Sequence, residues 1–185
     1  VTPVAEEKTE HSGEVPEVVF SHVGLTYAGA GEESLTDIDF TVKKGETIGI
    51  IGGTGSGKSS VVNLIPRFYH ATKGSVQIEG KDVREYSLEE LRGKIGMVLQ
   101  KAVLFKGTIR ENMLWGNENA TDEAIMQALE VAQAKEFVDK KEGGLDFEIE
   151  QGGKNLSGGQ RQRMTIARAV VKKPDILILD DSASA

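Results

Sequence analysis

Hydrophobic and polar positions change their spacing several times along the chain, and each change marks a predicted element. Between residues 18 and 51, short runs rich in β-branched and aromatic residues are separated by turns, which is typical of strands. Farther along, apolar residues recur every three or four positions, which is typical of amphipathic helices. The pattern predicts strands at residues 18–27, 35–42, 46–51, 75–78 and 175–179, the last as a buried strand.

Helix boundaries are marked by capping residues. Ser87 and Thr108 are each followed three residues later by a glutamate, the spacing of a capping box, so a helix is expected to begin after each. Pro66 helps to end a helix that opens at Lys58. Further helices are predicted over residues 58–65, 121–134 and 157–171. Strands that alternate with helices favour an α/β core with a parallel sheet, preceded here by an antiparallel β-rich portion.

The first seventeen residues follow no apolar pattern. They contain Pro3, Pro16, five glutamates and one lysine, which is typical of a solvated linker or tail. This segment carries −4 of the chain's net charge of −7, so the part from Val18 onward is almost neutral.

Composition excludes several kinds of function. The 185 residues include no cysteine, and the three histidines share no ligand spacing, so thiol nucleophiles are excluded and a zinc site is disfavoured. An acidic balance argues against nucleic acid as a partner, because phosphates require a basic surface. Apolar runs are far shorter than the roughly 20 residues that cross a bilayer.

A glycine-rich loop carries the clearest chemistry. Residues 52–59, Gly-Gly-Thr-Gly-Ser-Gly-Lys-Ser, fit G-x-x-x-x-G-K-[ST] between a predicted strand and a predicted helix. Glycines let backbone N–H groups surround a phosphate, Lys58 can reach the β and γ phosphates, and Ser59 can ligate Mg²⁺. The loop therefore predicts a nucleotide triphosphate site.

Two later segments suit the same chemistry. An apolar strand over residues 176–179 ends in Asp180 and Asp181, which can face Mg²⁺ and an attacking water if the strand lies beside the phosphate loop. Ser157 and two glycines begin a predicted helix, whose free N–H groups form a second anion-binding device. One chain cannot easily aim both devices at one phosphate, which favours a second copy facing the first.

Together these motifs resemble the nucleotide-binding domain of ABC transporters, from Val18 to the end of the chain. Residues 52–59 are similar to the Walker A motif, 176–180 to Walker B, and 156–160 to the LSGGQ signature. The resemblance implies a P-loop NTPase fold. Its parallel-sheet core has an antiparallel β subdomain, and a helical subdomain at about residues 101–170 carries the signature.

The resemblance also assigns roles to residues, with ATP and Mg²⁺ as cofactors. The residues that would bind ATP are Tyr27, stacking on adenine, and Gly52, Gly53, Thr54, Gly55, Ser56, Gly57, Lys58, Ser59 and Ser60. Mg²⁺ would be held by Ser59, Gln100 and Asp180, and catalysis would use Lys58, Gln100 and Asp181. The signature residues Leu156, Ser157, Gly158, Gly159 and Gln160 would contact the ATP of a second nucleotide-binding domain in a head-to-tail dimer.

Within the family, the stretches 67–69 and 107–112 are most similar to exporters, in which a transmembrane domain precedes the nucleotide domain on the same polypeptide. Residues 1–17 would then be the linker from that domain. Residues 18–185 would be an ATP-binding domain that stops within its D-loop, at the cytoplasmic face of the cell membrane. The implied function is ATP binding and hydrolysis that power export.

One departure from the family pattern carries a further hypothesis. The family usually has Glu after the Walker B aspartate as catalytic base, whereas this chain has Asp181. A carboxylate displaced by about 1 Å can cost on the order of a hundredfold in rate. The departure therefore predicts a heterodimer in which this chain's own site is weakened and its signature completes the partner's site.

Two alternatives stay open. Asp181 and the early end of the chain also suit a nucleotide-binding regulatory module with little hydrolysis of its own. A soluble ABC-type ATPase of DNA repair or chromosome structure would share the signature, but it would insert a long coiled coil where this chain has only residues 101–155, without heptads.

Overall fold

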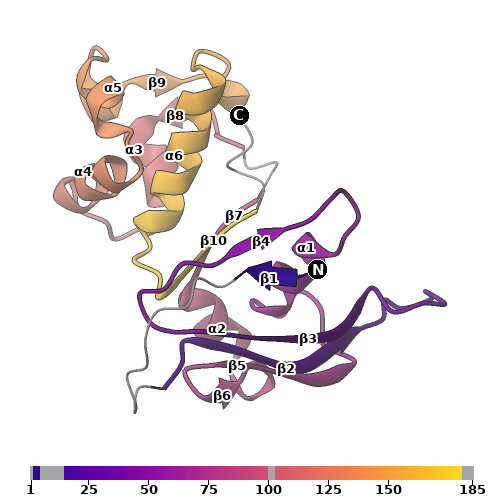
Figure 1. The fold of residues 1–185 in the computed structure, drawn as a ribbon. Coiled ribbons are helices and arrows are strands. Elements are labelled where there is room, and N and C mark those ends of the chain that lie inside the picture. Colours follow the sequence, from indigo (N-terminus) through magenta and orange to yellow (C-terminus); the bar gives the residue numbers. More distant parts are fainter. Residues whose placement is uncertain (1, 5–14, 100–102, 181–185) are drawn as a thin grey trace. The chain divides into compact units, whose positions relative to one another are not determined.

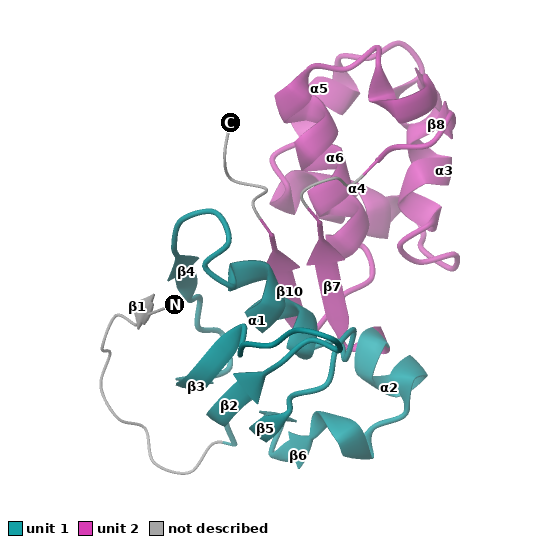
Figure 2. Ribbon diagram, turned by 90° about the vertical axis from the view of Figure 1, so that its right-hand side faces the viewer, with its two compact units in different colours: residues 1–92 teal, residues 93–185 magenta. Residues whose placement is uncertain are grey.

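The computed structural model describes residues 2–4, 15–99 and 103–180, and it divides into two compact units, Val1–Arg92 and Gly93–Ala185 (Figures 1 and 2). The first unit contains β1 (Thr2–Val4), β2 (Val18–Leu25), β3 (Leu35–Val42), β4 (Gly49–Ile51), α1 (Lys58–Leu64), β5 (Lys73–Ile78), β6 (Lys81–Asp82), the 3-10 helix η1 (Val83–Glu85) and α2 (Leu88–Gly93).

An antiparallel sheet of four strands, in the order β3-β2-β5-β6, forms the centre of the first unit. Phe20 of β2 lies opposite Phe40 of β3, and their rings stack with centroids 4.4 Å apart. Phe20, Val23 and Ile78 are almost fully buried, so the alternation in the sequence does mark the face that packs. The antiparallel β portion predicted from the sequence is confirmed here.

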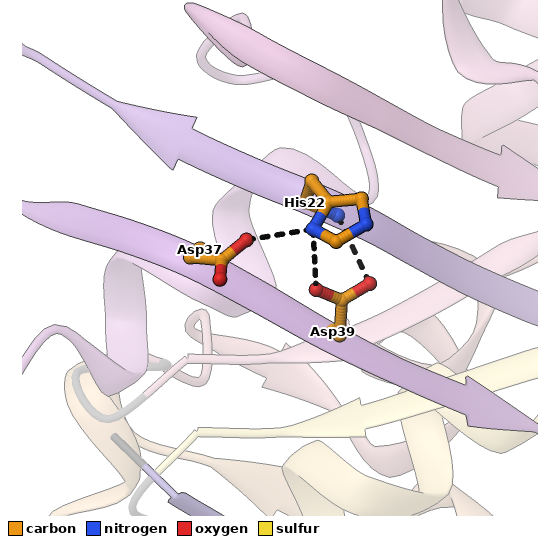
Figure 3. Close-up of side chains that lie close together, drawn as sticks. All are labelled: His22, Asp37 and Asp39. Atoms are coloured by element: carbon orange, nitrogen blue, oxygen red, sulfur yellow. Dashed lines mark hydrogen bonds and ion pairs between the residues drawn. The ribbon is translucent and has the colours of Figure 1, made fainter.

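Two bulges interrupt the pairing of β2 with β3. The register slips by one residue on each side of the pair Val23 and Ile38, in opposite directions. His22 and Asp37 take left-handed φ angles of 47° and 50° there, and bulges of this kind redirect side chains. As a result His22 Nδ1 lies 2.7 Å from an Asp37 oxygen and 3.1 Å from an Asp39 oxygen on the exposed surface (Figure 3).

The segment expected to be a solvated linker contains a short strand. β1, Thr2–Val4, pairs antiparallel with β4, and Pro3 lies opposite Ile50. A strand with an open edge offers unpaired N–H and C=O groups, and proline is tolerated in an edge strand. The sequence pattern did not predict this strand, and the assignment of residues 1–17 as a linker stays a prediction.

The second unit contains mostly short elements. In chain order they are β7 (Ile95–Val98), β8 (Gly107–Thr108), α3 (Ile109–Leu114), α4 (Asp122–Val131), α5 (Lys135–Asp139), the 3-10 helix η2 (Gly144–Asp146), β9 (Glu148–Ile149), the 3-10 helix η3 (Gln151–Gly153), α6 (Gly158–Val170) and β10 (Ile176–Leu179). No helix among the described residues is long and apolar enough to cross a membrane.

Helix α6 organises the core of the second unit. It contacts α3 and α4, and its Met164 and Ala167 are fully buried. Ile109, Ile125 and Leu129 from the neighbouring helices are also fully buried in this cluster. The spacing of apolar residues along the sequence therefore marks the packed faces of these helices correctly.

A parallel pair of strands, β10 and β7, completes the second unit. The parallel pairing agrees with the predicted core, although the sequence analysis did not identify β7 as a strand. β10 was expected to be buried, but Leu177 and Leu179 are 42% and 48% exposed. Side chains alternate between the two faces of a strand, and Ile178, which points the other way, is buried.

Candidate functional site

The glycine-rich loop lies between β4 and α1, as its motif requires. Gly55 and Gly57 have φ angles of 78° and 90°, which other residues rarely adopt, and the Ser56 N–H donates to the Gly53 carbonyl at 3.1 Å to close a turn. Gly57 is the N-cap of α1 and supplies no side-chain cap. Since the Val61 N–H makes the first helical bond, to Gly57, the amides before it have no acceptor within the helix.

Close packing inside the loop explains one glycine. A side chain at Gly52 would place its Cβ 2.3 Å from Ser56 Oγ, so the Ser56 side chain would have to move to make room for it. Ser56 Oγ is buried and has no hydrogen-bond partner among the described residues. A buried hydroxyl without a partner costs free energy, and an oxygen of a bound phosphate would satisfy it. The loop therefore fits a phosphate group on grounds of this structure.

Lys58 bends back over the same loop. Its Nζ donates to the carbonyl oxygens of Gly52 and Gly53, at 2.5 and 3.0 Å. Within the described part of the chain the ammonium has no carboxylate partner, so its charge is not neutralised. An ammonium held by carbonyls beside open amides would attract an anion of high charge density.

Tyr27 and Ser60 come together although they are 33 residues apart in the sequence. Their hydroxyl groups are hydrogen-bonded at 2.7 Å. Tyr27 follows the end of β2, and Ser60 lies in the first turn of α1, two residues after Lys58. The Tyr27 ring also meets Tyr69 edge to face, with centroids 4.9 Å apart. The aromatic residue predicted to stack on a base is therefore fixed directly to the helix that follows the phosphate loop.

Of the three predicted Mg²⁺ ligands, the structure describes Ser59 and Asp180. Ser59 is exposed in α1. Asp180 follows β10, and its N–H extends the ladder by donating to the Val98 carbonyl at 2.9 Å. These two residues belong to different units, and Gln100 and Asp181 lie outside the described residues, so a shared metal site remains a prediction. Carboxylate and hydroxyl oxygens are ligands that suit Mg²⁺.

The predicted signature forms the start of α6. Ser157 Oγ accepts the Gln160 N–H at 3.2 Å, and the Gln160 side chain accepts the Ser157 N–H at 3.0 Å. This reciprocal pair is a capping box, which satisfies two of the donors at the helix start. Leu156 is buried, whereas Ser157, Gly158 and the side of the turn that they form are open to solvent.

Tyr69 was missed by the sequence analysis as part of the site. It was noted only within a stretch similar to exporters, and nothing in the spacing of the sequence links it to Tyr27. The ring contact depends on how the segment after α1 returns to the end of β2, which only the tertiary structure shows.

Comparisons with known proteins agree with this geometry. A family model described as ABC transporter matches residues 35–184. An uncharacterized ABC transporter ATP-binding protein, YfiB of Bacillus subtilis, is 48% identical over 168 residues, which are 91% of this chain and 29% of that protein. A probable multidrug resistance ABC transporter ATP-binding/permease protein, YheI of the same species, is 44% identical over 169 residues with the same coverage.

A solved structure supports the fold. The ATP-bound structure of a bacterial Atm1-family ABC exporter matches with a TM-score of 0.83 and 36% identity, over 92% of this chain and 30% of that one. The chain therefore spans less than a third of the length of these relatives.

Proposed function

The chain belongs to the ABC transporter family, and on that premise we propose that it binds and hydrolyses ATP to power export across a membrane. Its mixed α/β architecture is the P-loop ABC ATPase fold. The named relatives are an ATP-binding protein and an ATP-binding/permease protein, and the matched structure is an exporter with ATP bound. Export and the partners that it requires are properties of the whole protein, of which this chain would supply the ATP-binding part.

The observation that carries the proposal is the phosphate loop with its attached aromatic residue. The Ser56 hydroxyl has no partner among the described residues, and the Lys58 ammonium lies against the loop carbonyls. The Tyr27 hydroxyl is hydrogen-bonded to Ser60, two residues after Lys58. A triphosphate would satisfy the hydroxyl and the cation, and a base would stack on the ring. A nucleoside triphosphate meets all three requirements, and the family points to ATP.

The roles of the residues follow from their chemistry. The loop amides and Lys58 would bind the β and γ phosphates, while Ser59 and Asp180 would hold Mg²⁺. Bound Mg²⁺ would neutralise the charge that develops on the phosphates. Gln100 and Asp181, predicted to orient and deprotonate the attacking water, complete the site in this proposal.

An exposed apolar patch supports a partner for the second unit. Val103, Phe105 and Trp115 are 41–71% exposed, the Phe105 and Trp115 rings lie 5.0 Å apart, and Arg168 contacts both the Val103 carbonyl and the Phe105 ring. Exposed apolar patches of this kind mark protein interfaces. The proposed partner is a transmembrane domain on the same polypeptide, which would place the chain at the cytoplasmic face of the cell membrane.

The dimer is a separate part of the proposal. The signature, Leu156 to Gln160, would contact ATP held by a second nucleotide-binding domain, arranged head to tail. Because Asp181 is one methylene shorter than the usual glutamate, this chain's own site would hydrolyse slowly, and the partner of a heterodimer would do most of the work. In the full-length pair, Asp181→Glu should raise ATP turnover. An unchanged turnover would contradict a weakened base.

Asp181 also favours a second candidate function, that of a regulatory nucleotide-binding module with little hydrolysis of its own. Measured ATP binding without turnover in the assembled transporter would favour that role. The third candidate, a DNA-repair or chromosome ATPase, is disfavoured because the short helices α3, α4 and α5 occupy residues 109–139, where that class needs a coiled coil.

Direct titration tests the proposal. ATP with Mg²⁺ should bind the 185-residue chain in a one-to-one complex by calorimetry. Lys58→Ala should weaken binding by roughly ten- to a hundredfold, the worth of a charge-assisted hydrogen bond. Lys44→Ala, which changes an exposed lysine in a turn, is the matched control and should leave binding unchanged. Equal affinity in the unmodified chain and both variants would contradict the assignment of Lys58 to phosphate binding.

A further inference from the structure

We propose that Ser60 and Tyr69 are positioning residues that hold Tyr27 ready to receive the nucleotide base. This inference rests on the proposed function, since it concerns how the same site selects a nucleotide that carries a base. The residues involved all belong to the first unit, and each of the contacts is described directly.

Ser60 fixes one end of the Tyr27 side chain. The hydrogen bond of 2.7 Å joins the two hydroxyl groups in a partly buried setting. Ser60 belongs to the helix that begins with Lys58, so the bond ties the phenol to the element that would hold the phosphates. The spacing between the base platform and the phosphate loop is thereby set before any ligand arrives.

A bond to the phenol oxygen cannot fix the plane of the ring. Rotation about the Cβ–Cγ bond turns the ring and leaves the hydroxyl where it is. Tyr69 supplies the missing restraint, because its ring stands at 87° to Tyr27 with centroids 4.9 Å apart. Edge-to-face pairs of this geometry are favourable, so the Tyr27 ring is held in one orientation.

Backbone contacts hold the two tyrosines at this distance. The Thr72 hydroxyl accepts the Thr26 N–H at 3.1 Å and donates to the Gly24 carbonyl at 3.2 Å, and the Thr72 N–H donates to the same carbonyl at 2.9 Å. Thr26 precedes Tyr27, and Thr72 lies three residues after Tyr69. The segments that carry the two rings are therefore tied together independently of the ring contact.

Preorganisation is the physical consequence. A stacking ring that is already ordered loses less conformational freedom when a base binds, so more of the stacking energy appears as affinity. The effect is confined to ligands that carry a base. A ligand that consists of phosphates alone should not detect whether Tyr27 is ordered.

This difference defines the test. Calorimetry would compare ATP with inorganic triphosphate, each with Mg²⁺, on the 185-residue chain. Ser60→Ala changes a residue expected to bind ATP, so both ligands are measured, and ATP binding should weaken by roughly two- to tenfold more than triphosphate binding, the worth of one hydrogen bond. Tyr27→Phe, which keeps the ring and removes the phenol oxygen, should give the same loss. The double variant should be no weaker than either single variant.

Tyr69→Leu should weaken the binding of ATP and leave the binding of triphosphate unchanged. Phe68→Leu changes a neighbouring exposed ring and is its matched control, while Ser87→Ala removes a serine hydroxyl that caps α2 and is the control for Ser60. Equal losses for ATP and triphosphate in Ser60→Ala would assign Ser60 to phosphate binding and overturn this inference alone. An unmodified chain that binds neither ligand would overturn the proposed function and this inference together.

Discussion

The phosphate loop and the signature turn both place serine and glycine at the start of a helix, yet they differ in how the helix is capped. In the loop, Gly57 caps α1 with a left-handed φ of 90° and no side chain. In the turn, Ser157 caps α6 and exchanges hydrogen bonds with Gln160. The start of α1 therefore has no side-chain cap, whereas two donors at the start of α6 are satisfied by the chain itself.

The difference shows what the motifs mean physically. An uncapped helix start beside a lysine and an unpartnered hydroxyl is unstable alone and gains from an anion. A helix start with a capping box is more stable alone, because the box satisfies two of its donors. This difference in capping is the physical basis of the proposal that the loop is this chain's own nucleotide site and that the turn meets another molecule.

The largest effect should come from filling the loop. Gly52→Ala would bring a Cβ within 2.3 Å of Ser56 Oγ and force that side chain or the loop to move. A loop whose shape or whose Ser56 hydroxyl is displaced should bind ATP more weakly, by roughly tenfold or more in calorimetry, because charge-assisted hydrogen bonds to the phosphates are misaligned.

A rescue variant isolates the cause. Gly52→Ala combined with Ser56→Gly removes the clash and should regain part of the lost affinity. Gly49→Ala, at a β4 position with open space around it, is the control and should bind ATP normally. A Gly52→Ala chain with unchanged affinity would show that the shape of the loop does not govern binding.

Substitutions in the signature turn should change the stability of the chain and not its affinity for ATP. Ser157→Ala removes the cap of α6, which should lower the free energy of unfolding by about 1 kcal/mol in chemical denaturation. Ser157→Asn keeps a capping oxygen and should lose less. Neither change should alter ATP binding to the isolated chain. A drop in ATP affinity for Ser157→Ala would break the distinction between the two helix starts.

The smallest effect should come from the bulged sheet of the first unit. The hydrogen bond to Asp37, followed by the charges of Asp39 and Asp37, raises the pKa of His22. Protonated His22 therefore stabilises the fold fully below its ordinary pKa of about 6.5, and the contribution is lost as the pH rises through the higher folded value. His22→Asn tolerates the positive φ and removes the charge.

Denaturation at pH 5.5 and pH 8.5 checks this. The stability gap between wild type and His22→Asn should be larger at the lower pH, while ATP affinity should match at each pH. A gap that widens toward high pH would contradict the sign of the pKa shift.

Local signals in the sequence predicted most elements. Thr108 forms the capping box that its spacing indicated, Ser87 Oγ accepts the Glu90 N–H at the start of α2, and the strand at residues 35–42 has the predicted bounds. The predicted helix at residues 121–134 stops at Val131, and α5 begins at Lys135. Gln133 has a left-handed φ of 57° between them, which ends the first helix. Neither glycine nor proline stands between Val131 and Lys135, so no local signal marks this break.

Features that depend on tertiary structure were not predictable in this way. The prediction that residues 52–59 bind phosphate rests on the motif alone, because loop and helix are contiguous in the sequence. The bond from Tyr27 to Ser60, the ring contact with Tyr69 and the unpartnered Ser56 hydroxyl each depend on how distant segments pack. The bulges at His22 and Asp37 likewise arise from pairing between strands.

Amide hydrogen exchange with and without ATP and Mg²⁺ tests the central claim most directly, at a concentration where the chain is monomeric. We expect slower exchange in residues 52–60, where the loop amides acquire phosphate acceptors, and unchanged exchange in residues 156–160, where the capping box already exists. Unchanged exchange in the loop, or protection that appears at the signature turn instead, would contradict the assignment of the loop as this chain's own ATP site.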